Sequence, residues 1–215
     1  MTALSARDGY RLWAPTYAAE TAISFLDEQL AREMLAGLPQ KKLLDAGCGT
    51  GRRIAGMTDA VGIDASPEMV AAGGDSNLMV ADIRALPFAS ARFAMTWCRL
   101  VLGHLADPLP AYQDLARVCE PGGYLFVTDF HPNAVTAGAR RSFRDGNGVV
   151  HEVEHHVHAD HPGLAAQTGF TLIERRDAGV GAAIRDFYER AGKLDVYEKD
   201  QGLKLVMAFL FRRAP

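Results

Sequence analysis

The stretch LLDAGCGTGRR, Leu43 to Arg53, restricts the possible folds more than any other part of the sequence. A short apolar run is followed by an acid and by glycines at positions 47, 49 and 51, a pattern typical of a strand that ends in a tight turn and opens a helix. In open α/β sheets, ligands bind at such turns, outside the carboxyl ends of the strands. The sequence therefore predicts an α/β fold with a ligand site at this turn.

Strand-like apolar runs alternate with helical patterns, which predicts a parallel sheet covered by helices on both faces. The predicted strands span residues 42–45, 60–64, 78–82, 93–98, 124–130, 170–175 and 203–212. Helices are predicted at 51–58, after Ser66-Pro67, at 109–119 and near 163–168. A turn at 145–148, between strand-like segments 140–144 and 149–158, predicts a hairpin, and residues 133–161 are interpreted as an insertion.

Length and composition indicate one domain over residues 1–215, with 48% hydrophobic residues to form its core. The net charge of -3 is spread along the chain, which argues against a basic surface for nucleic acid. With neither a secretory signal nor a long apolar segment, the sequence predicts no membrane contact and a cytoplasmic location. Three cysteines without paired spacing indicate a reducing compartment and no metal motif.

Acids at two further strand ends narrow the choice of ligand. The dinucleotide fingerprint G-x-G-x-x-G is not matched, because Arg52 stands where the third glycine belongs. Asp64 ends the run VGID, where its carboxylate can accept hydrogen bonds from both hydroxyls of a ribose. Asp82 and Ile83 end the third strand, where a carboxylate can accept from an exocyclic adenine amine. An adenosine-containing cofactor is therefore predicted.

Four motifs in order, LLDAGCGTG, VGIDASPEMV, ADIRALPF and LARVCEPGGYLFVTDF, resemble the class I S-adenosylmethionine-dependent methyltransferases. The resemblance covers about residues 41–131, and LKLVMAFLFRR resembles the last, antiparallel strand of that family. It implies a Rossmann-like, seven-stranded, mostly parallel sheet with helices on both faces, an antiparallel last strand and, here, a β-hairpin insertion after strand five. One departure is Ala94, where many relatives have an acid.

The resemblance also implies S-adenosylmethionine as cofactor, S-adenosylhomocysteine as product, and a set of cofactor-binding residues. Asp45 and Gly47 would lie at the methionine end, Asp64 with Ala65 at the ribose, and Asp82 with Ile83 at the adenine. The remaining residues implied are Cys48, Gly49 and Gly51 in the turn and Cys98 and Arg99 facing the methionine part. Taken singly, Asp45 could instead satisfy turn amides, and Asp64 could precede a helix N-terminus.

Two histidines are candidate catalytic bases for transfer to an oxygen or nitrogen atom of a small organic molecule. His104, in LVLGHLAD, occupies a place where similar small-molecule methyltransferases often have a histidine; the alternative is a residue hydrogen-bonded between strand and helix. His131 follows strand five directly, and its alternative role is to cap the turn before Pro132.

Two further segments are candidates for binding the acceptor. GYRLWAPTY resembles the YDxWAPxY segment of small-molecule methyltransferases, which implies that Tyr10, Trp13 and Tyr17 belong to a helical lid within residues 1–40; an amphipathic helix packed on the core is the alternative. HEVEHHVHADH, residues 151–161, shows no zinc spacing, so no metal is predicted. His151 and His155 would share one strand face and contact the acceptor in the cap 133–161.

Three rival functions remain at this point. An RNA or protein methyltransferase is disfavoured by the scattered charge and by the lack of an Asn-Pro-Pro-aromatic motif after strand four. A non-catalytic S-adenosylmethionine-binding module and a nicotinamide oxidoreductase are the others. The identity of the acceptor and the oligomeric state are not indicated by the sequence.

Overall fold

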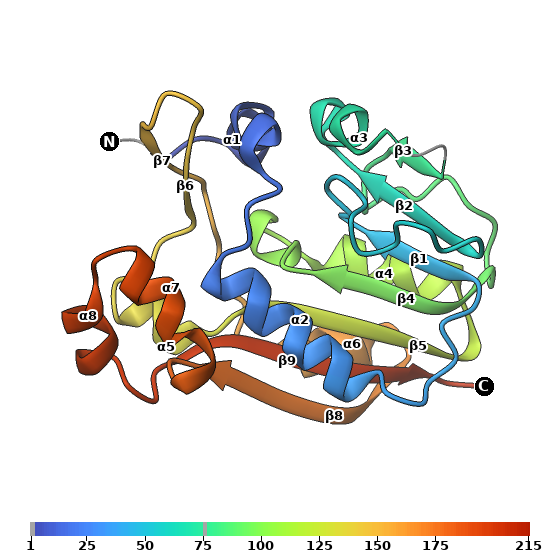
Figure 1. Ribbon diagram of the computed structural model, residues 1–215. Helices are drawn as coiled ribbons and strands as arrows, with labels where there is room; N and C mark the ends of the chain where they lie inside the picture. The colour runs from blue at the N-terminus through green and yellow to red at the C-terminus, as the bar shows by residue number, and fades with distance from the viewer. Residues whose placement is uncertain (1–2, 75–76) are drawn as a thin grey trace.

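The structure, a computed structural model, describes residues 3–74 and 77–215 (Figure 1). Met1 and Thr2 of the predicted lid lie outside the described residues. In the described part of the chain, seven strands form one sheet in the order β3-β2-β1-β4-β5-β9-β8. Their bounds are β1 Leu43–Ala46, β2 Ala60–Asp64, β3 Leu78–Val80, β4 Phe93–Arg99, β5 Cys119–Phe130, β8 Phe170–Gly179 and β9 Lys204–Arg213.

The directions of the strands confirm the predicted fold class. Strands β1 to β5 pair in parallel, whereas the last strand, β9, runs antiparallel to both β5 and β8. Strand β1 lies in the middle of the sheet, and its buried residues Leu43 and Leu44 are apolar, as expected for a strand covered on both faces.

Helices cover both faces of this sheet (Figure 1). The α-helices are α1 Ala6–Trp13, α2 Ala22–Met34, α3 Pro67–Gly73, α4 Leu109–Val118, α5 Pro132–Thr136, α6 His161–Gln167, α7 Arg185–Arg190 and α8 Leu194–Lys199. Short 3-10 turns are η1 Ala14–Thr16, η2 Leu102–His104 and η3 Ala182–Ile184. Helix α2 lies in front of the sheet in Figure 1, and α4 and α6 lie behind it.

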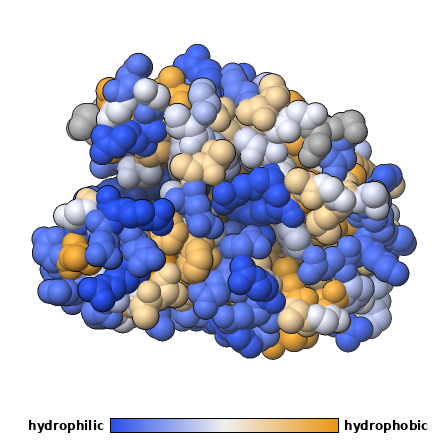
Figure 2. All heavy atoms as spheres, viewed as in Figure 1, coloured by the Kyte–Doolittle hydropathy of each residue, from blue (hydrophilic) through white to orange (hydrophobic). Residues whose placement is uncertain are grey.

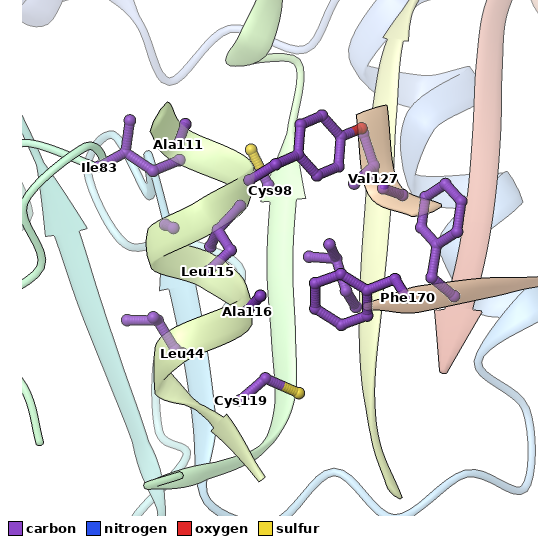
Figure 3. Close-up of a cluster of buried hydrophobic side chains, with 14 of the residues drawn as sticks. Leu44, Ile83, Cys98, Ala111, Leu115, Ala116, Cys119, Val127 and Phe170 are labelled. Atoms are coloured by element: carbon purple, nitrogen blue, oxygen red, sulfur yellow. The ribbon is translucent and has the colours of Figure 1, made fainter. Parts of the chain in front are cut away.

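Each face of the sheet has its own apolar core. On the α4 side, Leu115 and Ala116 pack against Leu44 and Val127, as the close-up in Figure 3 shows. On the opposite side, the apolar face of α2, including Leu26 and Leu30, packs against β8 and β9. The two layers hold the sheet rigid, so that the strand ends can present side chains at fixed positions.

The helix predicted at residues 51–58 does not form. Successive i to i+3 hydrogen bonds, from Gly51 N to the Cys48 carbonyl, Ile54 N to Gly51 and Met57 N to Ile54, make a run of turns instead. Gly51 and Gly56 both have a positive φ, which a right-handed helix does not allow. The prediction was wrong because it took the glycine turn as the start of a helix.

Only part of the predicted 1–40 lid is free of the core. Helix α2 begins at a capping box formed by Thr21 and Ser24 and buries Leu26 and Leu30 against the sheet, so it is a core helix. Helix α1 instead contacts α3, above the sheet edge in Figure 1, and buries only Gly9. The lid interpretation is therefore restricted to the segment 3–17.

Between β5 and α6 the chain forms a two-stranded hairpin, β6 Ser142–Arg144 and β7 Val150–Glu152. Both strands are shorter than the segments 140–144 and 149–158 predicted from sequence. Residues 153–160 then run without regular structure. Leu4 pairs with Val153 in a bridge, which joins the N-terminal segment to residues 153–160. The prediction that His151 and His155 share one strand face was wrong, because the strand ends at Glu152.

Hydrophilic residues cover most of the face shown in Figure 2, and its hydrophobic residues lie in small groups. Across residues 3–74 and 77–215, the helices are too short or too polar for any of them to span a membrane.

Candidate functional site

A cavity of about 550 Å³ opens at the carboxyl ends of the first four strands, beneath α1. Its volume is in the range of sites that bind cofactors and small ligands. Its walls come from α1, the glycine turn, the ends of β2 and β3, and the segment after β4. The residues are Ala6, Arg7, Tyr10, Tyr17, Gly47, Gly49, Ile63, Asp64, Ala65, Ser66, Val80, Ala81, Asp82, Ile83, Arg84, Arg99, Leu100, Val101, His104, Leu105 and Ala106.

Two glycines let the backbone form the floor of this cavity. Gly47 and Gly49 have φ values of 82° and 59°, which L residues rarely adopt. A β-carbon at Gly47 would also collide with the side chain of Val101, and at Gly49 it would lie 3.2 Å from the ring of Tyr17. Both the backbone angle and the available space therefore require glycine here.

Asp64, at the end of β2, lines the cavity and holds the turn together. Its Oδ2 accepts from Gly49 N at 2.8 Å and its Oδ1 from Ser66 N at 2.9 Å. Burial raises the pKa of Asp64, while the amides of Ser66 and Gly49 partly oppose that rise. The alternative considered from sequence, that Asp64 precedes a helix N-terminus, also describes its position, since Ser66 is the N-cap of α3. Each carboxylate oxygen still has a free lone pair.

Asp82 and Ile83 lie at the end of the third strand, on the cavity wall as the sequence placed them. The Asp82 carboxylate pairs with Arg84, whose Nη2 lies 2.6 Å from Oδ2, and this pairing lowers the pKa of Asp82. Ala65 lines the same wall beside Asp64. Arg84 and Ser66 were missed in the sequence, although both follow a predicted site acid by two residues.

Asp45 is fully buried at the end of β1 and is not part of the cavity surface. Neither of its carboxylate oxygens has a hydrogen-bond partner among the described residues, which excludes the alternative that it satisfies turn amides. Burial raises its pKa, and the charges of Arg53 and Arg99 oppose that rise. A buried, unpartnered carboxyl is costly and calls for a ligand or water contact.

His104 meets Tyr10 at the end of the cavity nearest α1. Its Nδ1 lies 3.1 Å from the carbonyl oxygen of Glu154, so Nδ1 carries the proton, and Nε2 accepts from the Tyr10 hydroxyl at 2.9 Å. Burial and the charge of Arg141 lower the pKa of His104 to about 3. Burial raises the pKa of Tyr10 to about 12. Both groups are therefore neutral near pH 7.

The three predicted lid aromatics form one cluster but do not share one cavity. Tyr10 and Tyr17 line the main cavity, whereas Trp13 stacks on Phe143 of β6 with 4.9 Å between ring centroids. Trp13 also lines a separate small cavity with Tyr17 and Arg141. The N-terminal segment is thereby attached to the hairpin as well as lying over the main cavity.

The segment after β4 contributes a strained residue that sequence reasoning missed. Leu100 has φ 60° and lines both cavities. No sequence signal marks it, since leucine has no preference for this conformation. The preceding Arg99 lines the cavity too, but its guanidinium pairs with Asp27 at 2.9 Å and Glu28 at 2.8 Å on α2.

Besides Asp45, three further residues implied by the resemblance do not line the cavity. Cys98 is fully buried in the apolar cluster on the α4 side, where Figure 3 shows it among Leu115 and Val127. Cys48 is buried with its Sγ 3.5 Å from the Gly49 carbonyl oxygen. Gly51 faces Leu78. The alternation of side chains along β4 directs Cys98 toward the α4 side and the next residue, Arg99, toward Asp27 on α2.

The assignment of His131 as a catalytic base is also wrong. His131 is the N-cap of α5, where its Nδ1 accepts from Asn133 N at 3.1 Å. Its Nε2 lies 3.7 Å from Asp177 on β8, and the residue does not line the main cavity. The alternative that it caps the turn before Pro132 is the one observed, and α5, which begins there, contacts β9.

The histidine-rich segment 151–161 contacts His104, through the Glu154 carbonyl and the ring of His155, but does not itself line the main cavity. His151 pairs with Asp145 across the hairpin turn at 2.9 Å, and His155 lies 3.4 Å from the buried Asp129, so neither lines the cavity. Asp129 also lies 3.4 Å from His161. Burial alone would raise the pKa of Asp129, but the two histidines lower it below its usual range. Within 3–74 and 77–215, no group of three or more potential ligands is arranged to hold a metal ion.

Comparisons with known proteins agree with this geometry. A family model described as a methyltransferase domain matches residues 44–127, which hold the glycine turn and the acids of β2 and β3. The 27-O-demethylrifamycin SV methyltransferase of Amycolatopsis mediterranei is 32% identical over 171 residues, which are 69% of this chain and 62% of that protein. The chain belongs to the class I S-adenosylmethionine-dependent methyltransferases.

Another member of this methyltransferase family is the malonyl-[acyl-carrier protein] O-methyltransferase of Herminiimonas arsenicoxydans, 36% identical over 118 residues. That match covers 50% of this chain and 45% of the relative, so the chain spans about half to two thirds of the length of these relatives. An S-adenosylmethionine-dependent methyltransferase from Mesorhizobium loti shares the fold, with a TM-score of 0.65 at 16% identity over 87% of this chain and 98% of that one. The cofactor of this family is S-adenosylmethionine.

Proposed function

We propose that this protein transfers the methyl group of S-adenosylmethionine to an oxygen or nitrogen atom of a small organic molecule. Oxygen is favoured, since the Herminiimonas relative is an O-methyltransferase by name. The observation that carries the proposal is a single cavity that joins the glycine turn, Asp64 and Asp82 to a neutral histidine, His104.

The residues present fit the cofactor. Gly47 and Gly49 line the cavity with bare backbone, because a β-carbon there would meet Val101 or Tyr17, and this suits a ligand lying against the backbone. Asp64 retains free lone pairs for the ribose hydroxyls, and Asp82 with Ile83 forms the wall for the adenine. The unpartnered carboxyl of Asp45, two residues before Gly47, suits the ammonium group of the methionine part, directly or through water.

The rest of the mechanism concerns how the protein places the acceptor. When bound, the cofactor supplies an electrophilic methyl carbon, so the protein has to align the acceptor atom and exclude water. His104 offers Nε2, which now accepts from Tyr10; an acceptor hydroxyl that replaces Tyr10 would be oriented by the same nitrogen. The segment 3–17 acts as a lid and the insertion 133–161 as a cap on the acceptor side.

Calorimetric titration of the protein with S-adenosylmethionine, S-adenosylhomocysteine and a reduced nicotinamide dinucleotide tests the cofactor. Asp64→Asn should weaken binding of the first two at least tenfold, because a ribose acceptor is lost. Glu68→Gln, at a half-buried acid of α3 that does not line the cavity, should not. Binding of the nicotinamide cofactor alone would reject the proposal.

Transfer of a labelled methyl group to phenols, amines and carboxylic acids, with RNA and protein as further acceptors, tests the reaction. His104→Gln should lower kcat more than it raises KM for the cofactor. Transfer to RNA or protein only would reject the small-molecule acceptor. Tight cofactor binding without transfer to any acceptor would instead favour a non-catalytic S-adenosylmethionine-binding module.

A further inference from the structure

Arg141 is half-buried, and its guanidinium forms no ion pair with an acid among residues 3–74 and 77–215. It lies between α5 and β6, and its guanidinium carbon is 5.4 Å from the ring centroids of both Trp13 and Phe130. Its Nε is buried without a hydrogen-bond partner. Burying a guanidinium is costly unless an anion or a full set of acceptors compensates it. The aromatic rings supply only part of that compensation.

The one side-chain hydrogen bond of Arg141 in the described structure connects it to the main cavity. Its Nη2 donates to the Tyr10 hydroxyl at 2.8 Å, and that hydroxyl lies 2.9 Å from Nε2 of His104. The guanidinium is therefore two hydrogen bonds away from the group that is placed to orient the acceptor. Since Tyr10 lines the cavity, a ligand that displaces its ring would meet Arg141 next.

Asp129, whose charge raises the pKa of Arg141, pairs with histidines instead. Asp129 lies at 3.4 Å from both His155 and His161, and no hydrogen bond joins it to Arg141 in the described residues. Its charge acts on Arg141 only at longer range. The protein thus provides a cation at this place while committing the adjacent acid to the histidines.

A small cavity next to the main one is lined by three positively charged side chains. Arg52, Arg53 and Arg141 all line it, and Tyr17 and Leu100 belong to the walls of both cavities. The Nε of Arg53 also lacks a partner, although its Nη2 pairs with Asp27 at 3.2 Å. Two guanidinium Nε groups without acceptors therefore lie around one space beside the methyl-transfer site.

We propose that Arg141 binds a carboxylate group of the methyl acceptor, so that the substrates are small organic acids. Nε and Nη2 are the two atoms with which a guanidinium binds a carboxylate side-on, and Arg99 uses this pair on Asp27 at 3.2 and 2.9 Å in the same protein. The acceptor carboxylate takes the free Nε and replaces the Tyr10 hydroxyl on Nη2. This releases Tyr10 from Arg141 when an acid enters.

This inference rests on the proposed function, and its test separates the two. The protein saturated with S-adenosylhomocysteine is titrated with two matched pairs, phenylacetate against phenylacetamide and octanoate against octanamide. The acids should bind at least tenfold more tightly than their amides. Arg141→Gln should reduce acid binding to the level of the amides and change the affinity for S-adenosylhomocysteine less than twofold.

Two further variants control for folding and for general charge. Arg141→Lys keeps the cation without the side-on geometry and should retain part of the preference for acids. Arg140→Gln removes the charge of the exposed neighbouring residue and should leave every affinity unchanged. Thermal unfolding of each variant shows whether a loss of binding reflects a loss of folded protein; if Arg141→Gln does not fold, Arg141→Lys decides.

Equal binding of acids and amides, or of none of the four probes, would overturn the inference. So would an Arg141→Gln variant that keeps the preference for acids, or one that loses S-adenosylhomocysteine instead, since Arg141 would then hold the cofactor. Failure of the proposed function looks different: the wild-type protein would not bind S-adenosylhomocysteine at all. In that case, titration of the unliganded protein with the same pairs still decides whether Arg141 binds carboxylates.

Discussion

Replacement of Asp27 by asparagine tests the ion-pair network that joins α2 to the end of β4. Asp27 is 1% exposed and accepts from Arg99, Arg53 and Thr128, with Thr128 Oγ1 only 2.6 Å from Oδ1. The side chains of Arg99 and Arg53 are 2% and 7% exposed, so Asp27→Asn leaves two guanidiniums buried beside a neutral amide. Removal of one partner from a buried pair typically costs about 3–5 kcal/mol.

For a chain of this length, about 2–4 °C of Tm is lost for each kcal/mol, so Tm should fall by roughly 6–20 °C. Glu33→Gln is the matched control, because Glu33 lies on the same helix and its pair with Arg176 is exposed; such pairs contribute about 0–1 kcal/mol. Differential scanning calorimetry at pH 7 measures both variants. An Asp27→Asn protein that unfolds no earlier than Glu33→Gln would refute the reasoning.

The stabilisation that Asp27 provides should depend on pH in a defined direction. Burial alone would raise the pKa of Asp27, but the charges and hydrogen bonds of Arg99 and Arg53 lower it below its usual value. A carboxylate whose pKa is lowered by folding stabilises the protein above its unfolded pKa, near 3.9, and the stabilisation is lost as pH falls through the folded value. The difference in Tm between wild type and Asp27→Asn should therefore be constant from pH 5 to 8 and shrink below about pH 4.

Three other predictions concern the cavity. Gly47→Ala should weaken S-adenosylhomocysteine binding at least tenfold in calorimetry, since its β-carbon would meet Val101, whereas Gly74→Ala, at a similar φ of 72° but in open space, should not; equal effects would contradict the steric argument. His104, with its pKa lowered to about 3, should show no NMR titration between pH 5 and 8. Because the unfolded chain binds a proton at this histidine near pH 6.5, the free energy of unfolding should fall as pH drops below that value, and it should fall less in His104→Asn. Asp82→Asn should raise the KM for the cofactor and lower the free energy of unfolding by less than about 1 kcal/mol, since the Asp82 side chain is 43% exposed. An unchanged KM would exclude the adenine role.

The prediction of the sheet succeeded because its signals are local. Apolar runs mark buried strands, and the acids at the ends of the first three runs mark the carboxyl edge. Asp64 and Asp82 therefore lie on the cavity wall as expected. The helix at 51–58 was wrong for an equally local reason, since Gly51 and Gly56 adopt positive φ values that the apolar pattern does not reveal.

The positions of the histidines could not be predicted from local sequence patterns. His104 and His131 follow predicted strand ends, and His155 belongs to a predicted hairpin strand. Sequence alone offered each of them a place near the acceptor. The structure places only His104 at the cavity, while His131 caps α5 and His155 lies against the buried Asp129. What separates them is the path of the chain after β5, which depends on packing against β8 and the N-terminal segment.

The sequence by itself determined the fold class, the family and the strand ends that carry the cofactor acids, because strand period and glycine conformation act between neighbouring residues. Only the tertiary structure decided which groups meet at the acceptor end. Tyr10 lies 94 positions before His104 and 131 before Arg141 along the chain. The hydrogen bonds among them form only once the N-terminal segment and the insertion have packed over β4 and β5. No pattern within one segment encodes such contacts, since they depend on how distant elements pack together.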